Sequence, residues 1–392
     1  MMQKVCVAGV GQTPFGKFLE RGVRSLAEEA LDVALKDAGI EAASIQTVFF
    51  ANALSGLITG QESIRGQVAL RHTGLMGTPI INIDNACASG SSAFKLAWLS
   101  VASGEVDVAL AIGSEKLTHV DKAVTFSAYA SGIDVEERDR MNRDVPAGHS
   151  VFMDIYAEKA RRYMASSGAT AEDFALVTVK SRQGGSLNPY AQFRDPITVE
   201  EVLAGRIIAE PLTLPMCSPI ADGAAATILV SEKLARNMTR KPIYVRATEL
   251  VSANPDGAAP LCAARAADRA YAVAGIGPED VHVAEVHDAS APAEIMLYEH
   301  LRFAARNEGV ELLRSGATSI GGRLPVNSGG GLLSRGHPVG ATGLAQMVEL
   351  VAQLRGDAGP RQRNGAQVAL AECSGGQIGT DSALAAVTIL ST

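Results

Sequence analysis

The chain has 392 residues, of which 47% are hydrophobic and 20% are charged, and its formal net charge is −7. This length suits two domains, or one duplicated architecture, with an ample apolar core. The acidic balance excludes a general basic surface for nucleic acid or acidic membrane. No run of about 20 apolar residues predicts a transmembrane helix.

The N-terminal stretch MMQKVCVAGVGQTPFG predicts a strand and a glycine-rich turn rather than a signal peptide. It lacks the G-x-G-x-x-G spacing, and the chain holds no Walker motif, so nicotinamide binding is unsupported. The five cysteines, at positions 6, 87, 217, 262 and 373, include no C-x-x-C pair. This argues against a zinc site within the chain and against a disulfide framework, and we expect a cytoplasmic protein with reduced thiols.

Short apolar runs predict buried strands in both halves of the chain. In the first half they cover residues 4–10, 44–54, 107–115 and 224–231. In the second half they cover residues 242–253, 281–289, 367–375 and 382–390. Alternation of such strands with helical patterns indicates an α/β fold.

Two of these strands share the run Val-Ala-Leu-Ala, in DVALAIGSE (107–115) and QVALAECSG (367–375). A helix rich in small residues precedes each one, over residues 87–104 and 337–356. Cys87 begins the first helical stretch and His337 begins the second, in what we take to be matching places. We therefore predict two related α/β halves whose helix starts lie near a shared pseudo-two-fold axis.

Residues 117–219 are richer in charged residues and less regular in pattern than the segments on either side. They include the charged run DVEERDRMNRD (134–144), an amphipathic helix over 153–168 and the irregular QGGSLNPYAQFRDP. The strand pattern resumes directly afterwards in DGAAATILVS, which argues against a separately folded module. We predict an insertion laid over the active face. The N-terminal half is then 1–116 with 220–245, and the C-terminal half is 246–392.

Three further motifs carry candidate chemistry. Pro338 keeps His337, in SGGGLLSRGHPVGATG, extended at a helix entrance. His287 and Asp288 follow a buried strand, where loops often carry chemistry, although Asp288 alone would also suit a cap of the following helix. Cys373 precedes a glycine-rich turn whose N–H groups suit an anion. Taken alone, His337 or Cys373 would usually be structural, whereas a purely structural role is the minority interpretation for His287.

Together the motifs resemble the thiolases, and more closely the sterol-carrier-protein-type thiolases. The resemblance rests on NACASGSSA, NPYAQFRDPITVEEVL, CSPIADGAAA, HDA, NSGGGLLSRGHPVGATG and CSGGQIG, which span nearly the whole chain in the family's order. It implies two βαβαβαββ halves in a five-layer αβαβα sandwich with an inserted loop domain. It also implies acyl transfer at the α-carbon of a coenzyme A thioester, with no permanently bound cofactor and no metal.

The resemblance assigns roles to individual residues. Cys87 is the nucleophile, with its thiolate favoured by a helix N-terminus, and His337 is its base. Cys373 is the second acid and base. His287 and His337 form an oxyanion hole for the enolate, and the N–H groups of Cys87 and Gly375 form another for the tetrahedral intermediate.

The acyl and coenzyme A sites are less determined. Where the family commonly has an aromatic residue, separated from the HD motif by one residue, this chain has Ser290, so the pocket wall near His287 is expected to be roomier or more polar. Asp288 and Ser290 are candidate pocket residues. Met153 is either a pocket methionine or a helix-core residue. Three arginines in the insertion are candidates for the coenzyme A phosphates: Arg182, Arg194 and Arg206.

Three alternatives stay open. A β-ketoacyl synthase has a similar nucleophile but needs no Cys373, a retro-aldol lyase on the same scaffold needs neither cysteine, and a non-catalytic scaffold needs none of the four residues. The resemblance further implies a homodimer at least, and a small zinc-ribbon/OB-type partner subunit in relatives that handle branched or aromatic acyl groups. The acyl chain and the direction of the reaction stay open.

Overall fold

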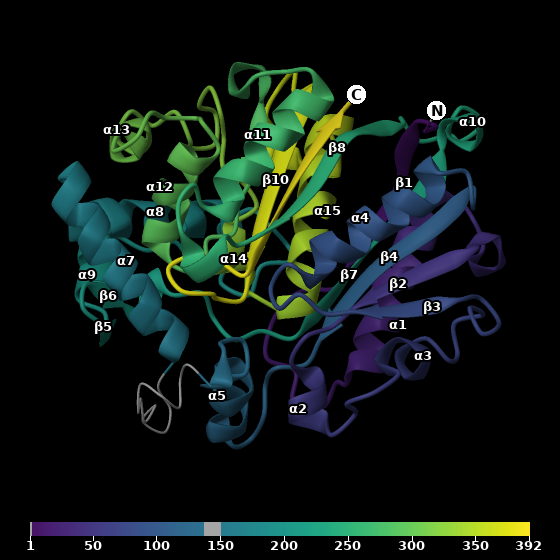
Figure 1. Ribbon diagram of the computed structural model, residues 1–392, viewed down its shortest axis with the longest axis horizontal. Coiled ribbons are helices and arrows are strands. Elements are labelled where there is room, and N and C mark those ends of the chain that lie inside the picture. The colour runs from purple at the N-terminus through teal and green to yellow at the C-terminus, as the bar shows by residue number, and fades with distance from the viewer. Residues whose placement is uncertain (1, 137–149) are drawn as a thin grey trace.

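A computed structural model describes residues 2–136 and 150–392 (Figure 1). Within these residues, nine strands form one mixed sheet in the order β3-β2-β4-β7-β1-β8-β11-β10-β9. The first-half strands are β1 (Val5–Gln12), β2 (Thr47–Ala51), β3 (Ile80–Ile83), β4 (Val108–Glu115) and β7 (Gly223–Ser231). The second-half strands are β8 (Ile243–Ser252), β9 (Val283–Glu285), β10 (Val368–Gly375) and β11 (Leu384–Ser391). The predicted α/β fold class is confirmed.

The two halves repeat one pairing pattern. In the first half, β1 runs antiparallel to β7, β7 antiparallel to β4, and β4 and β3 both parallel to β2. In the second half, β8, β11, β10 and β9 repeat this order and direction, and a single parallel bridge from Ala284 to Val326 stands where a counterpart of β3 would lie. The two Val-Ala-Leu-Ala runs form the equivalent strands β4 and β10. The halves meet where β1 pairs antiparallel with β8.

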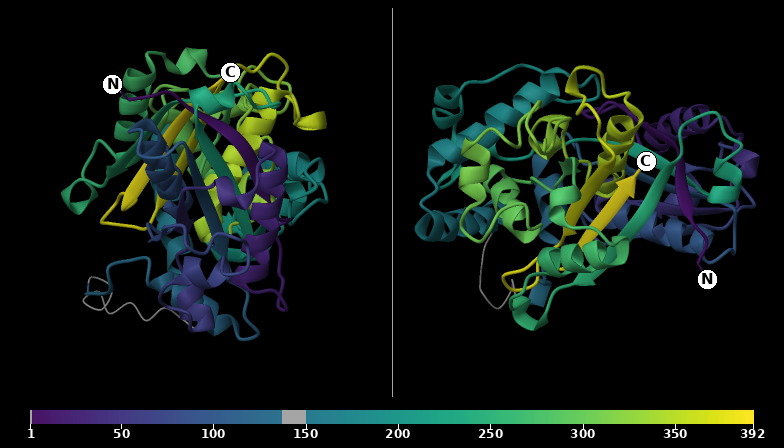
Figure 2. Two further views of the ribbon diagram at one scale, coloured as in Figure 1. Left: turned by 90° about the vertical axis from the view of Figure 1, so that its right-hand side faces the viewer. Right: turned by 90° about the horizontal axis from the view of Figure 1, so that it is seen from above.

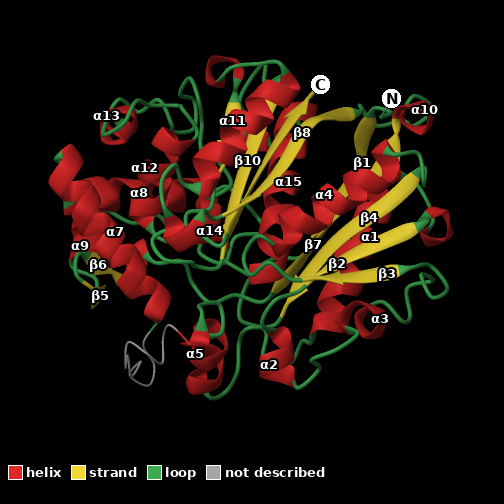
Figure 3. Ribbon diagram, in the orientation of Figure 1, coloured by secondary structure: helices red, strands yellow, loops and turns green. Residues whose placement is uncertain are grey.

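Two helices lie between the halves, and others cover the outer faces (Figures 1 and 3). The central pair is α4 (Ser89–Ala102) and α15 (Thr342–Arg355). A Cβ atom at Gly90 would lie 3.0 Å from the Gly340 carbonyl oxygen, and one at Gly343 would lie 2.2 Å from Ser91 Oγ. Glycine therefore allows the two helix starts to approach closely. The outer helices are α1 (Val23–Ala38) on the first half and α11 (Cys262–Ala274) on the second.

The predicted match between Cys87 and His337 is wrong by three residues. Helix α4 begins at Ser89 and α15 begins at Thr342, after a 3₁₀ turn over Val339–Ala341. Superposing the helix starts makes Gly340 the equivalent of Cys87. The extra turn, which follows Pro338, carries His337 further from its helix than Cys87 is from its own.

The chain between β4 and β7 forms a helical layer at one end of the molecule (Figure 2). Its longer helices are α5 (Lys122–Ala130), α7 (Val151–Ser167) and α8 (Ala171–Ser186), followed by α9 (Val199–Leu203) and the two-stranded sheet of β5 (Ile207–Ala209) and β6 (Leu212–Thr213). Residues 137–149, which include most of the charged run at 134–144, lie outside the described residues. The predicted domain boundary at 245/246 lies inside β8, and the domain limits stay a prediction.

The remaining helices are short or belong to the second half. They are α2 (Ser55–Thr59), α3 (Arg65–Ala69), α10 (Glu232–Ala235), α12 (Ala291–His300), α13 (Gly309–Arg314) and α14 (Gly331–Arg335). Helices α7, α8 and α12 share one hydrophobic cluster with α11, so the insertion packs directly on the second half. Across the described part of the chain, none of the helices has the length and apolar character that crossing a lipid bilayer requires.

Candidate active site

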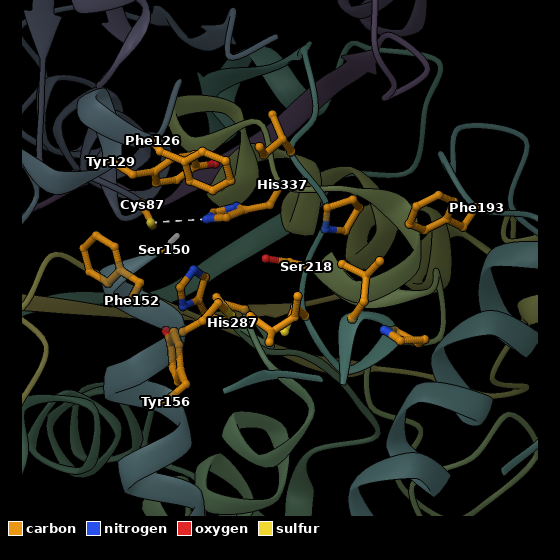
Figure 4. Close-up of a pocket in the computed structure, with 18 of the residues that line it drawn as sticks. Cys87, Phe126, Tyr129, Ser150, Phe152, Tyr156, Phe193, Ser218, His287 and His337 are labelled. Atoms are coloured by element: carbon orange, nitrogen blue, oxygen red, sulfur yellow. Dashed lines mark hydrogen bonds between the residues drawn. The ribbon is translucent and has the colours of Figure 1, made fainter. Parts of the chain in front are cut away.

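A cavity of about 540 Å³ lies where the two halves and the insertion meet. Cys87, His287 and His337 face one another in it (Figure 4). Aromatic side chains from α5 and α7 surround them, namely Phe126, Tyr129, Phe152 and Tyr156. The size is typical of a small-molecule site.

Cys87 is held by a tight loop between β3 and α4. Ala86 has φ of 49°, a left-handed conformation that non-glycine residues seldom adopt. The Ser89 hydroxyl donates to the Ala86 carbonyl over 2.6 Å and accepts the Asn85 N–H over 2.8 Å. These bonds fix the turn that directs Cys87 into the cavity.

His337 stands at the end of a glycine-rich segment that contains α14. The Asp288 carboxyl accepts the Leu332 N–H over 2.7 Å at the start of α14, and Gly336 at φ of 107° then turns the chain. A bridge from Ile220 to His337 gives the predicted extended backbone. His337 Nε2 lies 3.2 Å from Cys87 Sγ, and its Nδ1 lies 2.7 Å from Thr342 Oγ1.

The nucleophile and its partner base are both neutral at rest. Burial raises the pKa of Cys87 to about 12, with the Glu115 carboxylate contributing, and the nearby N–H groups of Cys87 and Gly376 oppose this only partly. Burial, with His287 and Arg335 nearby, lowers the pKa of His337 well below 6.5. Burial therefore outweighs the N–H groups near the sulfur in setting the pKa of Cys87, and the thiol proton must pass to His337, the predicted base, during the reaction.

His287 presents an unpaired nitrogen to the same space. It follows β9, is only 4% exposed, and its Nε2 has no hydrogen-bond partner among the described residues. Its ring centroid lies 5.2 Å from that of His337, at an angle of 68° between the planes. Burial lowers its pKa to about 4, so the imidazole is neutral near pH 7.

The three side chains also form the kind of cluster that holds a soft divalent metal. One ligand atom each from Cys87, His287 and His337 lies within 4.8 Å of the others. Thiolate and imidazole ligands suit zinc. The same convergence is what a cysteine–histidine acyl-transfer site needs, and cysteine spacing along the sequence could not reveal it.

Cys373 approaches this group from β10. Its Sγ lies 3.1 Å from the Cys87 carbonyl oxygen, and burial followed by the charge of Glu372 raises its pKa well above 9.0. Glu372, which sequence reasoning did not single out, is fully buried with its pKa raised by burial to about 7. It accepts the His287 backbone N–H over 3.1 Å. It therefore joins β10 to the loop that carries His287.

Two of the predicted pocket residues lie behind the cavity wall. Asp288 is fully buried and caps α14, which comes much later in the chain, instead of the following helix or the pocket. Ser290 is fully buried and pairs with Cys217, while Cys217 and Ala289 form the wall. Met153 does line the cavity.

The candidate phosphate-binding arginines separate by position. Arg182 lines the cavity, with its guanidinium 4.2 Å from the centre of the Phe193 ring, and Arg206 lines it as well. Arg194 is exposed and is not among the lining residues. Lys17 and Lys122 also line the cavity, and no sequence pattern distinguished them from other surface lysines.

The glycine-rich turn after Cys373 closes one side of the site. Gly375 and Gly376 both line the cavity. The Gly376 N–H faces the Cys87 sulfur and lowers its pKa, which sequence reasoning did not anticipate. Gly376 has φ of 65°, a conformation for which glycine is suited.

Known families match both halves of the chain. Residues 5–233 match the family model described as thiolase, N-terminal domain, and residues 245–392 match the one described as thiolase C-terminal domain-like. An acetyl-CoA acetyltransferase of Methanothermobacter thermautotrophicus is 39% identical, over 97% of this chain and 98% of that protein. The benzoylsuccinyl-CoA thiolase subunit BbsB of Thauera aromatica is also 39% identical, over 90% of this chain and 89% of that protein. Human sterol carrier protein 2 is 35% identical over 94% of this chain and 69% of its own length.

Solved structures agree with the fold. The Ltp2-ChsH2(DUF35) aldolase superposes with a TM-score of 0.81 at 26% identity, covering 99% of this chain and 98% of that chain. Human mitochondrial 3-ketoacyl-CoA thiolase superposes with a TM-score of 0.75 over 100% of this chain and 99% of that chain. At 19% identity, the second match carries the fold alone.

Proposed function

Because this chain belongs to the thiolase family, we propose that it is a coenzyme-A-dependent acyltransferase that forms or cleaves 3-oxoacyl-CoA through an acyl group on Cys87. One observation carries the proposal. Cys87 Sγ and His337 Nε2 lie 3.2 Å apart at the cavity, with the unpaired His287 nitrogen beside them. A nucleophile within hydrogen-bond reach of its base is the arrangement that covalent catalysis requires.

Acylation begins from the neutral pair. As Cys87 Sγ attacks the thioester carbonyl carbon, its proton passes to His337 Nε2. The new carbon–sulfur bond replaces the bond to the coenzyme A sulfur, which leaves as a thiolate and takes a proton from Cys373. The tetrahedral oxyanion is stabilised by the N–H groups of Cys87 and Gly375.

Carbon–carbon bond formation needs an enolate. The Cys373 thiolate takes a proton from the α-carbon of a bound acetyl thioester, and the resulting enolate attacks the acyl carbonyl carbon on Cys87. The bond from that carbon to Cys87 Sγ then breaks, and the sulfur takes back the proton from His337 Nε2. His287, and His337 with the proton now on Nε2, donate to the enolate oxygen. The buried, unpartnered Nε2 of His287 supports this role, because it is preorganised for an oxygen that arrives with the substrate. Cleavage is the reverse sequence.

Coenzyme A is a substrate of this reaction and not a resident cofactor. We propose that Arg182 and Arg206 meet its phosphates, with Lys17 and Lys122 at the same cavity, while Arg194 stays a weaker candidate. Met153 then lies along the acyl or pantetheine path. The acyl chain and the direction of the reaction are left open.

Acetylation of the protein tests the proposal directly. After mixing with acetyl-CoA, intact-mass measurement is expected to find one acetyl group on the wild type and none on Cys87→Ser. An adduct that persists in Cys87→Ser would overturn the assignment. Cys373→Ala is expected to keep the adduct and to lose acetoacetyl-CoA formation.

A retro-aldol lyase is the second candidate, because the Ltp2-ChsH2(DUF35) aldolase shares the fold at 26% identity. Such a lyase needs no acyl-enzyme, whereas this chain has Cys87 at the cavity and Cys373 next to the Cys87 carbonyl oxygen. The β-ketoacyl synthase alternative is disfavoured because it has no use for Cys373. Condensation only with malonyl thioesters would favour that alternative.

We also propose a homodimer formed along β3. The strand order leaves β3 at a sheet edge, with Ile81 43% exposed and nearby Met76 58% exposed. An exposed apolar edge strand is suited to pairing with a second copy. A small zinc-ribbon/OB-fold subunit stays a proposal too. Two relatives support it. The Thauera relative is named as a subunit of a thiolase, and the aldolase is named as Ltp2 together with ChsH2(DUF35).

We also propose that the protein is located in the cytoplasm. All five cysteines are described and free, which suits a reducing compartment. The catalytic scheme itself requires Cys87 and Cys373 to stay reduced.

A further inference from the structure

Each of the two central helices begins with a hydroxyl residue that binds the loop before it. Ser89 begins α4, and its hydroxyl donates to Ala86 while accepting the Asn85 N–H, as described above. Thr342 begins α15 at the equivalent position of the second half. Its hydroxyl donates to the Pro338 carbonyl over 3.0 Å. The duplicated fold thus supplies one loop-binding hydroxyl to each half.

The Thr342 hydroxyl has a second contact, with His337 Nδ1 over 2.7 Å. A hydroxyl has a single proton. When that proton lies toward the Pro338 carbonyl, the oxygen accepts the His337 Nδ1–H. This arrangement places the hydrogen of neutral His337 on Nδ1 and leaves the lone pair on Nε2, which faces Cys87 Sγ over 3.2 Å.

We propose that Thr342 is a positioning residue that holds His337 in the Nδ1–H tautomer and so completes a Cys87–His337–Thr342 chain. The lone pair on Nε2 is then ready for the Cys87 proton. When Nε2 accepts that proton, Nδ1–H stays bound to Thr342 Oγ1, so no rearrangement is needed on that side of the ring. The equivalent Ser89 orients the nucleophile loop in the same way but contacts no imidazole.

A threonine suits a base that must return its proton. A carboxylate in this place would add a negative charge beside the ring and stabilise the imidazolium, as the aspartate of a serine triad does. Thr342 orients the ring without that charge, since a hydroxyl is neutral. Arg335 and His287, which also face His337, disfavour the charged ring further.

The expected effect lies between two known costs. An ordinary hydrogen bond contributes up to about tenfold, and loss of the correct tautomer in a serine triad costs about 10⁴-fold in rate. Thr342→Val, which removes the hydroxyl at nearly constant volume, is expected to slow proton transfer from Cys87 about 100-fold. Thr342→Ser is expected to restore it to within a few-fold of wild type.

Two readouts test this without acyl-CoA. The first is the ¹⁵N spectrum of histidine-labelled protein, in which wild type and Thr342→Ser should have a protonated Nδ1 and an unprotonated Nε2 on His337. Thr342→Val should lose that pattern. The second is the rate at which iodoacetamide alkylates Cys87, followed by intact mass, which should fall in Thr342→Val but not in Thr342→Ser. Neither readout depends on the proposed acyl transfer, so failure of that function is distinguishable from failure of this inference.

Thr388→Val is the matched control. Thr388 is buried and donates to Thr248 over 3.0 Å in the sheet, away from the cavity. An equal loss of alkylation rate in this control would overturn the proposal by assigning the effect to general destabilisation. An unchanged His337 tautomer in Thr342→Val would overturn it as well. Ser89→Ala is expected to slow alkylation while leaving the His337 tautomer unchanged, and a changed tautomer there would contradict the assigned division of roles.

Discussion

Replacing His287 with leucine separates what this residue contributes to chemistry from what it contributes to stability. The His287 Nε2 is buried and has no partner among the described residues, so the folded chain carries the cost of an unpaired polar atom. That cost is about 1 to 3 kcal/mol. His287→Leu removes it and keeps the backbone N–H that Glu372 accepts. We expect the free energy of unfolding to rise by about 1 kcal/mol.

The same substitution removes one donor to the enolate oxygen. Loss of one oxyanion-hole donor costs about 100- to 1,000-fold in rate, or about 2.7 to 4 kcal/mol. We therefore expect exchange of the acetyl-CoA α-protons with D₂O, followed by mass spectrometry, to slow by that factor. Acetylation of Cys87 should change only a few-fold, because the Cys87–His337 contact is intact. An equal loss in both steps, or wild-type exchange, would refute the reasoning.

Three other buried or edge positions give separate expectations. Burial raises the pKa of Glu372 from 4.5 to about 7, so the folded chain holds a proton that the unfolded chain releases, and stability falls as the pH rises through that range. Glu372→Gln should remove this loss. In urea unfolding, its free energy of unfolding should exceed that of wild type by about 3 kcal/mol at pH 8 but not near pH 4. The same pH dependence of the free energy of unfolding in both proteins would contradict this expectation. Asp288→Ala should lower the free energy of unfolding by about 1 to 3 kcal/mol, because the α14 N–H groups lose their acceptor, and unchanged stability would show that the cap is not needed. Ile81→Lys on β3 should convert the proposed dimer to a monomer in light scattering, and a variant that stays dimeric would exclude the β3 interface.

Short-range patterns predicted the parts of this fold that are local. The strand runs became β1, β2, β4, β7, β8, β9, β10 and β11, and the shared Val-Ala-Leu-Ala run identified equivalent strands of a duplicated fold. The motifs also pointed to Cys87, His287 and His337, which the structure brings together. Their types and neighbouring glycines carry the signal, because reactive side chains at turns need close backbone approach.

The rest depends on contacts between distant segments. Asp288 caps α14, whose Leu332 lies 44 residues later in the chain, rather than the helix that follows it, so its partner is set by a tertiary contact. The neutral state of Cys87 follows from burial and from Glu115, and neither is visible in the motif. Thr342 is an ordinary residue of the sequence until the 3₁₀ turn sets its hydroxyl beside His337.

The duplication allows the surroundings of Cys373 to be compared with those of its counterpart in the first half. Strands β4 and β10 are equivalent over their full length, which makes Gly113 the counterpart of Cys373. A Cβ atom at Gly113 would lie 2.2 Å from the Gly340 carbonyl oxygen, so the first half packs tightly there. In the second half, Cys373 keeps its side chain beside the carbonyl of Cys87, the counterpart of Gly340. A glycine at this strand position thus allows close packing in the first half, whereas a cysteine at the equivalent position places a thiol beside Cys87 in the second half.

The last residues of the same two strands decide whether a backbone amide is free for the substrate. Glu115 ends β4, and its carboxyl accepts the Gly340 N–H over 2.7 Å. Gly375 ends β10 in the equivalent place, and it has no side chain to reach the N–H of Cys87. Even a Cβ atom there would lie 2.3 Å from the Asn85 carbonyl oxygen. The amide that Glu115 occupies in one half is thus left available in the other, and this is the amide that the proposed chemistry assigns to the tetrahedral oxyanion.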